Sequence, residues 1–324
     1  MYGGRGCFEQ EHVGGRAVTS VQLNPQGIEE EYLRCLNLCF GNWGDRRSYH
    51  WYFRRATAYP QTDLIVLREE ERLVAGSAVS YRRVAFPDGS AASVGIMTGS
   101  WTLPEFRGRG YFTRIIEESL RLTSNAGGGA LLAFVTEENS SFRQLMKAGA
   151  ALIPSSYLFS TPTTQGRAGA GRLQQVEKSE RVISEIFERL NDDRARRFCR
   201  FLYSSENDFR SQFIARPGEI EIYRDDAGSI GIVERKGETD LLQLCLTDVD
   251  DEAALTNCLA GFLSLALERR RKFFLYSMLP ALARTGERLG LGIKRGFLTI
   301  LPTGEGETHP WANHPWSVQG GDRL

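Results

Sequence analysis

The predicted order of helices and strands occurs twice along this chain, and this repeat restricts the fold more than any other feature. In the first half, three strands between 63 and 103 precede a helix at 112–125, and a strand, a helix and a closing strand follow. In the second half, three strands between 219 and 246 precede a long amphipathic helix at 251–270, and the same three elements follow again. Helices also come before the three strands in both halves. The architecture repeats although the residues do not, which predicts two similar domains of the α+β (α/β) class.

The domain boundaries follow from composition. The chain has 324 residues, more than one typical domain. Residues 161–172 (TPTTQGRAGAGR) contain no large apolar side chain and form the predicted linker. The linker separates a domain at 16–160 from a second domain at 173–301. Residues 1–15 are Gly-rich and polar and predict a flexible arm, and 302–324 predict a polar tail that contains tryptophan.

Composition also argues against several kinds of partner. Forty basic residues balance forty acidic ones, so the net charge gives no reason to expect nucleic acid or an anionic membrane surface. Six cysteines and four histidines occur without metal-ligand spacing, which predicts no metal site. The N-terminus has no apolar run like that of a signal peptide, and the longest apolar stretch, 259–267, is too short to span a bilayer. We therefore expect a soluble, cytoplasmic protein with reduced thiols.

One segment, TLPEFRGRGYFT at 102–113, predicts a phosphate site. A strand ends at Pro104, a turn with Gly108 and Gly110 follows, and an apolar-periodic helix begins near Tyr111. Glycine lets the backbone approach a ligand closely, and the start of a helix leaves four N–H groups without partners. The helix dipole adds partial positive charge at the same place. Such a bend can bind a diphosphate without a basic protein around it.

The charges and the spacing narrow this prediction. Arg107 and Arg109 add two full positive charges to the bend. The segment is not a Walker loop, because no Gly-Lys-Ser/Thr follows, and it lacks the third glycine of a Rossmann fingerprint. An ordinary turn between a strand and a helix would explain the glycines alone.

The residues of this bend resemble the first signature of the GNAT superfamily of acyl-CoA-dependent N-acyltransferases. That signature reads Arg/Gln-x-x-Gly-x-Gly/Ala, follows a proline and opens a helix. The chain has RGRGYF at 107–112, so Phe112 stands in place of the final small residue.

A second segment is similar to the second signature of this family. The apolar strand LLAFV at 131–135 leads to Asn139 and a short helix that ends at Gly149, with Ala150 where phenylalanine is usual. The resemblance covers roughly residues 17–160, including the order of the elements. It implies two GNAT-like domains, each with a mixed, mostly antiparallel central sheet flanked by helices.

The resemblance also implies how acetyl-CoA, or another acyl-CoA, would bind. The strand at 98–103 would splay from its neighbour and pair its free backbone with the pantetheine arm. Backbone amides of the bend would hold the pyrophosphate, with the Thr113 hydroxyl beside them. Asn139 would contact the pantetheine or the thioester region. The residues expected at the cofactor are Ser100, Trp101, Thr102, Arg107, Gly108, Arg109, Gly110, Tyr111, Phe112, Thr113 and Asn139.

The acid–base groups depart from the pattern of the family. The strand before the bend, SVGIMTGSWT, carries no glutamate, and the position of the usual tyrosine acid falls on Leu145. Glu137 and Tyr157 are the candidates for catalysis, beside Glu105 and Glu138. Each of them can also be a solvated carboxylate or a half-buried tyrosine. Attack through water without a dedicated base is a further alternative.

The aromatic run between 43 and 53 lies where the family covers its acceptor. Trp43, Tyr49 and Trp51 could stack on a sugar or another flat polar molecule, and Asp45 could pair with a cationic amine. Packing of an amphipathic helix explains Trp51 equally well.

The second half lacks the phosphate signature. Its counterpart of the bend, TDVDDEAALT at 247–256, has no glycine and four acidic residues, so it would repel a polyanion. We expect a degenerate copy that completes the acceptor site or an interface. The predicted function is acetyl or other short acyl transfer from acyl-CoA to the amine of a small acceptor, an amino sugar among them. The alternative is a non-catalytic module that binds CoA; a nucleotide-binding protein is the least favoured reading, and a homodimer is compatible with the sequence.

Overall fold

The computed structural model describes residues 19–164, 171–192, 197–304, 311 and 314–323. The predicted flexible arm at 1–15 and part of the predicted linker, 165–170, lie outside these residues. The elements of the first half are β1 (Thr19–Leu23), α1 (Glu29–Phe40), α2 (Arg46–Phe53), β2 (Asp63–Glu69), β3 (Arg72–Ala85), β4 (Ala91–Thr102), the 3₁₀ turn η1 (Pro104–Phe106), α3 (Tyr111–Asn125), β5 (Ala130–Thr136), α4 (Ser140–Lys147) and β6 (Ala151–Phe159).

The second half repeats this order, as predicted. Its elements are β7 (Gln174–Val176), α5 (Glu180–Leu190), β8 (Arg200–Phe201), α6 (Glu206–Phe209), the π-helical turn η3 (Arg210–Ile214), β9 (Glu219–Arg224), β10 (Ile230–Lys236), β11 (Thr239–Leu246), α7 (Glu252–Glu268), β12 (Lys272–Ser277), α8 (Pro280–Arg288), β13 (Gly292–Pro302) and the 3₁₀ turn η5 (Gly320–Arg323).

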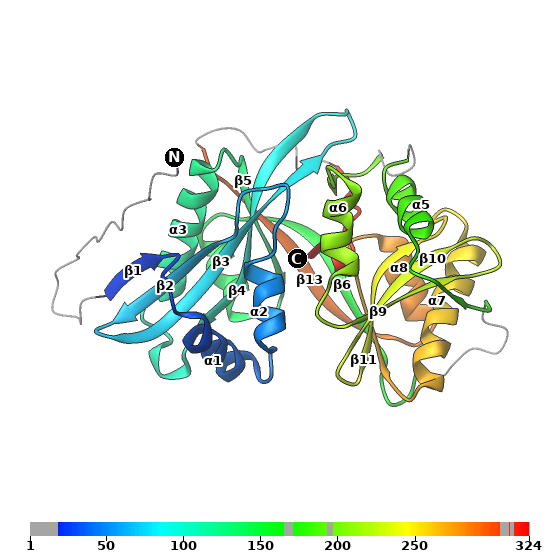
Figure 1. The fold of residues 1–324 in the computed structure, drawn as a ribbon, viewed down its shortest axis with the longest axis horizontal. Helices are drawn as coiled ribbons and strands as arrows, with labels where there is room; N and C mark the ends of the chain where they lie inside the picture. The colour runs from blue at the N-terminus through cyan, green and yellow to red at the C-terminus, as the bar shows by residue number, and fades with distance from the viewer. Residues whose placement is uncertain (1–18, 165–170, 193–196, 305–310, 312–313, 324) are drawn as a thin grey trace.

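One mixed sheet runs through both halves (Figure 1), in the order β1-β2-β3-β4-β5-β13-β6-β12-β11-β10-β9-β7, with β8 beside β3. The two halves exchange their closing strands. β13, the last strand of the second half, pairs with β5, and β6, the last strand of the first half, pairs with β12. The predicted fold class, a mixed sheet flanked by helices in two similar halves, is confirmed. The exchange itself was not predicted.

Helices cover both faces of the sheet, and small residues on the strands make room for them. Thr123 of α3 lies where a side chain on Gly95 would be, and Tyr32 of α1 lies against Gly76 on the opposite face. In the second half Phe262 of α7 packs in the same way over Gly231. A Cβ atom at Gly231 would lie 2.1 Å from the ring of Phe262, so this helix can approach only because the strand has glycine there.

The halves also touch through side chains away from the sheet. The indole of Trp51 on α2 donates a hydrogen bond to the carbonyl of Ser211 in η3, at 3.0 Å. Arg55 and Arg216 lie against the Trp51 ring, 4.0 and 4.4 Å from its centroid. Trp51 is therefore a buried anchor between the first and second halves.

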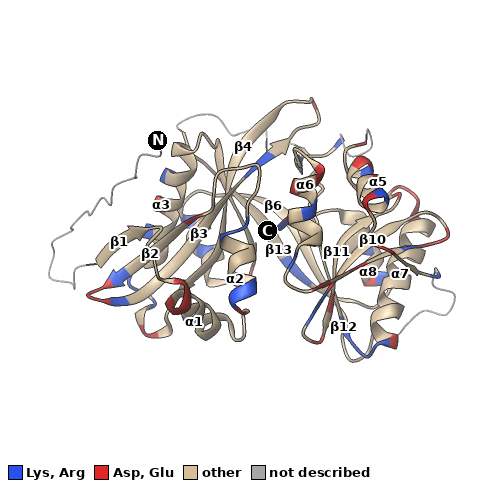
Figure 2. Cartoon of the chain, in the orientation of Figure 1, with Lys and Arg blue, Asp and Glu red and all other residues tan. Residues whose placement is uncertain are grey.

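The surface carries both signs of charge. Figure 2 shows lysine and arginine interspersed with aspartate and glutamate on both halves. No helix in the described part of the chain is long and apolar enough to cross a membrane.

Candidate functional site

The site begins where two parallel strands separate. β4 and β5 pair only from Val94–Ala130 to Ile96–Leu132. Beyond this point no described strand lies beside residues 97–102 of β4 on that edge, and 133–136 of β5 keep only their pairing with β13, on the opposite edge of β5. We call the space between these two segments the first wedge. The splay agrees with the expectation from the sequence.

A β-bulge bends β4 at this wedge. Ala78 pairs with Thr98 and Gly76 with Trp101, so Gly99 and Ser100 together oppose one residue, Ser77, on β3. The Ser77 hydroxyl lies 2.7 Å from the hydroxyl of Ser100 and donates to the carbonyl of Thr98 at 3.3 Å. Gly99 has φ of 56°, in the left-handed region that favours glycine. The bulge turns the free edge of β4 away from β5.

The bend that follows β4 leaves its amides available. Gly108 and Gly110 have φ of 79° and 86°, and Gly110 stands at the N-cap of α3 with no side chain to cap the helix. Among the residues that the structure describes, no acceptor takes the amide hydrogens of the five residues from Gly108 to Phe112. The first amides that bond within the helix are those of Thr113 and Arg114, both to the carbonyl of Gly110. An exposed helix start with five unused donors is the arrangement that binds a phosphate oxygen.

The two arginines of the bend differ in their partners. Arg109 lies 3.1 Å from a carboxylate oxygen of Glu69 and 4.7 Å from the ring centroid of Phe106. In the described part of the chain, the only hydrogen bond of the Arg107 guanidinium goes to the carbonyl of Thr102, at 3.4 Å. Both side chains are exposed, so the attraction between Arg109 and Glu69 is weak. The bend therefore adds two cations to its backbone donors. Arg107 forms no ion pair with a described acidic residue, and Glu69 partly neutralises Arg109.

The side chains of three other predicted cofactor residues, Trp101, Tyr111 and Asn139, pack in the core or cap a helix. The Trp101 ring is buried against Tyr32, with ring centroids 5.5 Å apart, and Tyr111 is also buried. What Trp101 can offer to a ligand is its backbone. The side-chain oxygen of Asn139 accepts from the amide of Ser141 at 3.3 Å and caps α4.

The candidate acid–base groups lie at the end of β5 and on β6. Glu137 follows β5 directly and is exposed. The ring of Tyr157 lies against Gly296, where a Cβ atom would meet it at 2.2 Å, and Gly296 pairs with Thr136 at the end of β5. Tyr157, on β6, is therefore separated from the end of β5 by β13. Its ring also packs on Tyr276, with centroids 5.0 Å apart.

The two remaining carboxylates are committed elsewhere. Glu138 forms an ion pair with Lys294, and Glu105 forms one with Arg72. A hydrogen bond from its own backbone amide, together with Arg72, lowers the pKa of Glu105, so this carboxylate stays ionised at neutral pH. Glu105 is therefore a poor candidate for taking up a proton at the wedge.

The aromatic run forms helix α2, and its geometry favours packing over acceptor binding. Tyr49 is 1% exposed and Trp51 6% exposed, so neither ring has a free face for stacking. Trp43 stacks on Phe53, with centroids 5.7 Å apart and planes at 12°. Asp45 is the N-cap of α2 and accepts hydrogen bonds from the amide and the hydroxyl of Ser48, at 2.8 and 2.7 Å.

Comparison with known families decides what this arrangement is. Residues 22–136 match the model of the acetyltransferase (GNAT) domain. This part of the first half is therefore similar to a GNAT domain. The match ends at the last residue of β5, so it includes both sides of the first wedge and the bend at the start of α3.

Solved structures extend the GNAT likeness to the whole chain. A tandem GNAT protein from the clavulanic acid biosynthesis pathway superposes with a TM-score of 0.62 at 13% identity, over 89% of this chain and 100% of that one. A GCN5-related N-acetyltransferase from Sphaerobacter thermophilus gives 0.58 at 11% identity, over 90% and 98%. The N-myristoyltransferase of Saccharomyces cerevisiae, solved with bound myristoyl-CoA, gives 0.62 at 11% identity, over 96% and 88%. At these identities the likeness is one of fold, which is that of tandem GNAT proteins and acyltransferases. No curated protein matches this sequence.

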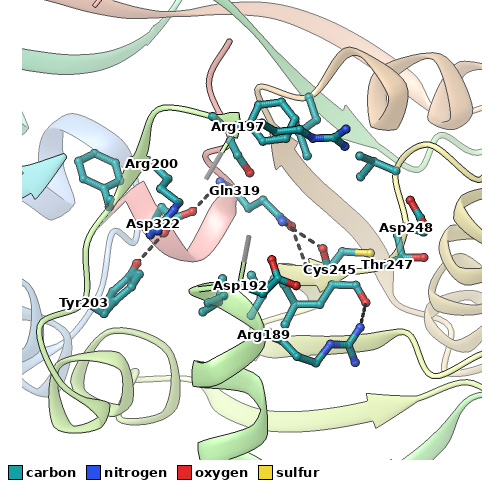
Figure 3. Close-up of a pocket in the computed structure, with 18 residues that line it drawn as sticks. Arg189, Asp192, Arg197, Arg200, Tyr203, Cys245, Thr247, Asp248, Gln319 and Asp322 are labelled. Carbon is teal, nitrogen blue, oxygen red and sulfur yellow. Dashed lines mark hydrogen bonds between the residues drawn. The ribbon is translucent and has the colours of Figure 1, made fainter. Parts of the chain in front are cut away.

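The second half contains a second wedge of the same construction. β11 and β12 are parallel from Thr239–Lys272 to Leu242–Leu275 and then separate, and Gln243 forms a bulge at the separation. We call the space between 243–246 of β11 and 276–279 the second wedge. A cavity of about 160 Å³ lies at its open end (Figure 3).

Carboxylates occupy several backbone donors where the helix at the second wedge starts. Asp251 caps α7 and accepts from the amides of Ala253 and Ala254, both at 3.0 Å. The amide of Asp250 donates to the carboxylate of Asp248 at 3.1 Å. In α3 a bare glycine stands where α7 has a capping carboxylate. Asp251 therefore occupies these two amides and places a negative charge where a phosphate would bind.

Sequence reasoning missed the C-terminal segment at this second wedge. The large apolar side chains in the described part of the predicted polar tail are buried: Trp311 is 1% exposed, Trp316 2% and Val318 0%. Two tryptophans and a valine within eight residues were the available signal, because large apolar side chains seldom remain in solvent.

Proposed function

We propose that the first half binds acyl-CoA in the first wedge and transfers a short acyl group, acetyl in the simplest case, to the amine of a small acceptor. The observation that supports this most strongly is the set of five unused amides from Gly108 to Phe112 beside the unpaired edge of β4. These amides suit the pyrophosphate. The edge of β4 at Ser100–Thr102 suits the amides of the pantetheine arm, which can pair with it as a neighbouring strand would.

Positioning is the main chemical task of this site. A bound acyl-CoA supplies a thioester, whose carbonyl carbon forms a bond to the amine nitrogen while its bond to sulfur breaks. The edge of β4 fixes the direction of the arm, and the bulge at Gly99 and Ser100 directs it into the space between the strands. Holding both reactants in one geometry lowers the barrier by several kcal/mol, on the order of 7–11 in well-oriented systems.

Two protons must move during the reaction, and we propose one residue for each. We assign Glu137, at the end of β5, to accept the proton that the amine loses, directly or through water. We assign Tyr157, on β6 beyond β13, to protonate the leaving thiolate. If Tyr157 is this acid, Tyr157→Phe keeps the packing on Tyr276 but lowers kcat by about 100-fold. An unchanged kcat in this variant would show that Tyr157 is not the acid. It would not contradict the proposed binding site.

Binding is tested by thermal unfolding with and without acetyl-CoA. At a hundredfold excess over Kd, a ligand stabilises the native protein by about 2.7 kcal/mol. Gly110→Asp places a carboxylate among the unused amides and should abolish this stabilisation. Gly89→Asp is the matched control, because Gly89 has the same φ of 86° and open space around it but lies in a turn outside the wedge. Equal effects of the two substitutions, or stabilisation by ATP or NAD instead, would contradict the proposal.

The alternative function is a module that binds acyl-CoA without transferring the acyl group. The ion pairs of Glu105 and Glu138 favour it, because they leave few free bases at the wedge. Release of free CoA thiol from acetyl-CoA across a panel of amines, amino sugars included, separates the two. Thiol release that depends on both the amine and Gly110 supports the enzyme, and binding without release supports the module.

A further inference from the structure

The C-terminal segment of the chain lies inside the second wedge. The amide of Met278, just beyond β12, donates to the carbonyl of Val318 at 3.1 Å, and Gln319 forms an antiparallel bridge with Ser277. From the other side of the wedge, the amide of Cys245 on β11 donates to the side-chain oxygen of Gln319 at 2.7 Å. Residues 318–319 therefore link the two strands where they no longer pair with each other.

Gln319 pairs with the edge of β11 through its side chain. Its carboxamide accepts from the amide of Cys245 and donates to the carbonyl of the same residue at 3.1 Å (Figure 3). One amide group thus satisfies both backbone groups of one strand residue, as an amide of a neighbouring strand does. Gln319 is 5% exposed, so these two hydrogen bonds are shielded from water.

Two glycines allow the segment to approach this closely. A Cβ atom on Gly320 would lie 2.9 Å from the side-chain oxygen of Gln243, and one on Gly321 would lie 2.0 Å from the ring of Phe213. The carbonyl of Gly321 accepts from the side chain of Gln212 at 2.5 Å. The fit of the segment to the bulge of β11 therefore depends on the absence of side chains at both glycines.

The next residues extend from the second wedge to the junction of the halves. The carboxylate of Asp322 accepts from the hydroxyl of Tyr203 and from the amide of Gln319, at 2.5 and 2.8 Å. Arg323 then lies over the rings of Tyr276 and Tyr157, 4.4 and 4.7 Å from their centroids. The position of Gln319 therefore determines where Arg323 contacts Tyr157, the residue that we assign as the acid.

The two wedges differ in one respect. Both have separating parallel strands and a bulge, yet in the described residues only the second is bridged by another segment of the chain. We propose that the second wedge is the binding site of the chain's own C-terminal segment, 316–323, in which the Gln319 carboxamide takes the place of a cofactor amide. The full chain consequently binds a single acyl-CoA, at the first wedge. This last consequence rests on the function proposed above.

Calorimetric titration of the full chain with acetyl-CoA tests the consequence. We expect one molecule per chain, and none after Gly110→Asp. Two molecules per chain, or one that persists in Gly110→Asp, would overturn the proposal, because the second wedge would then be open. If the wild-type chain binds no acetyl-CoA, the proposed function is wrong. The binding of segment 316–323 in the second wedge is then tested by hydrogen exchange alone.

Hydrogen exchange of the Cys245 amide tests, without any cofactor, whether Gln319 binds to β11 in the second wedge. Gln319→Ala removes the acceptor of this amide, and we expect its exchange to become roughly tenfold faster. Gln174→Ala, at an exposed glutamine of β7, is the matched control and should leave the exchange unchanged. Gln319→Met, which keeps the volume but has no amide, replaces the alanine variant if that variant unfolds. Unchanged exchange at Cys245 in a folded Gln319 variant would overturn the proposal.

Discussion

Single residues at the starts of two helices distinguish the halves of this protein. α3 begins after Gly110, which has no side chain to bond to the amides, and α7 begins after Asp251, whose carboxylate takes two of them. A glycine cap leaves a site for an external anion, whereas an aspartate cap supplies the anion itself. The sequence was sufficient to predict this contrast, because glycine and acidic residues at a helix start act locally.

Asp45 illustrates a residue whose role the sequence left open. Hydrogen bonds from the Ser48 amide and then the Ser48 hydroxyl lower the pKa of Asp45. A carboxylate with a lowered pKa stabilises the folded state above its ordinary pKa and loses this contribution as the pH falls through the folded value. We expect Asp45→Ala to lower the free energy of unfolding by about 1 kcal/mol at pH 7. The gap from wild type should narrow below pH of about 3.9, the ordinary aspartate value.

Asp45→Ser is the control for this prediction, because serine also caps helices. It should restore most of the stability at pH 7 and leave KM for the amine unchanged. A raised KM in Asp45→Ser would instead support the cationic-acceptor role, which the sequence suggested and the capping geometry disfavours.

At the scale of elements, the strands and helices were predictable but their partners were not. The apolar patterns of 151–160 and 292–301 predicted two closing strands, and β6 and β13 are those strands. Their exchange between the halves depends on contacts such as Thr136–Gly296, whose residues are far apart in the sequence. Local periodicity says which face of a strand is buried but not which strand lies beside it.

The C-terminal segment was predicted as a polar tail from composition, and this prediction was wrong. Trp316 is 2% exposed and its indole donates to the carbonyl of Trp311 at 2.9 Å. We expect Trp316→Ala to lower the free energy of unfolding by about 3–5 kcal/mol, measured by chemical denaturation. Leu38→Ala is the control, because Leu38 is 65% exposed and should change stability by less than about 0.5 kcal/mol. A similarly small effect at Trp316 would mean that the segment is not packed as described.

At the scale of the whole molecule, the exchanged strands predict that the halves unfold together. Neither half has its closing strand without the other, and Trp51 adds a buried contact between α2 and η3. We expect one transition in calorimetry, with a calorimetric enthalpy close to the van't Hoff enthalpy. Two separated transitions in the wild-type chain would show that each half is stable without the strand it receives.

The two similar wedges of the molecule have different occupants in our proposal. The first binds the cofactor, and the second holds residues 316–323. Selective ¹⁵N labelling of glycine reports on both wedges in one titration with acetyl-CoA, through Gly108 and Gly110 at the first and Gly320 and Gly321 at the second. We expect the amide resonances of Gly108 and Gly110 to shift and those of Gly320 and Gly321 to stay in place. Shifts at Gly320 and Gly321, with none at Gly108 and Gly110, would contradict it.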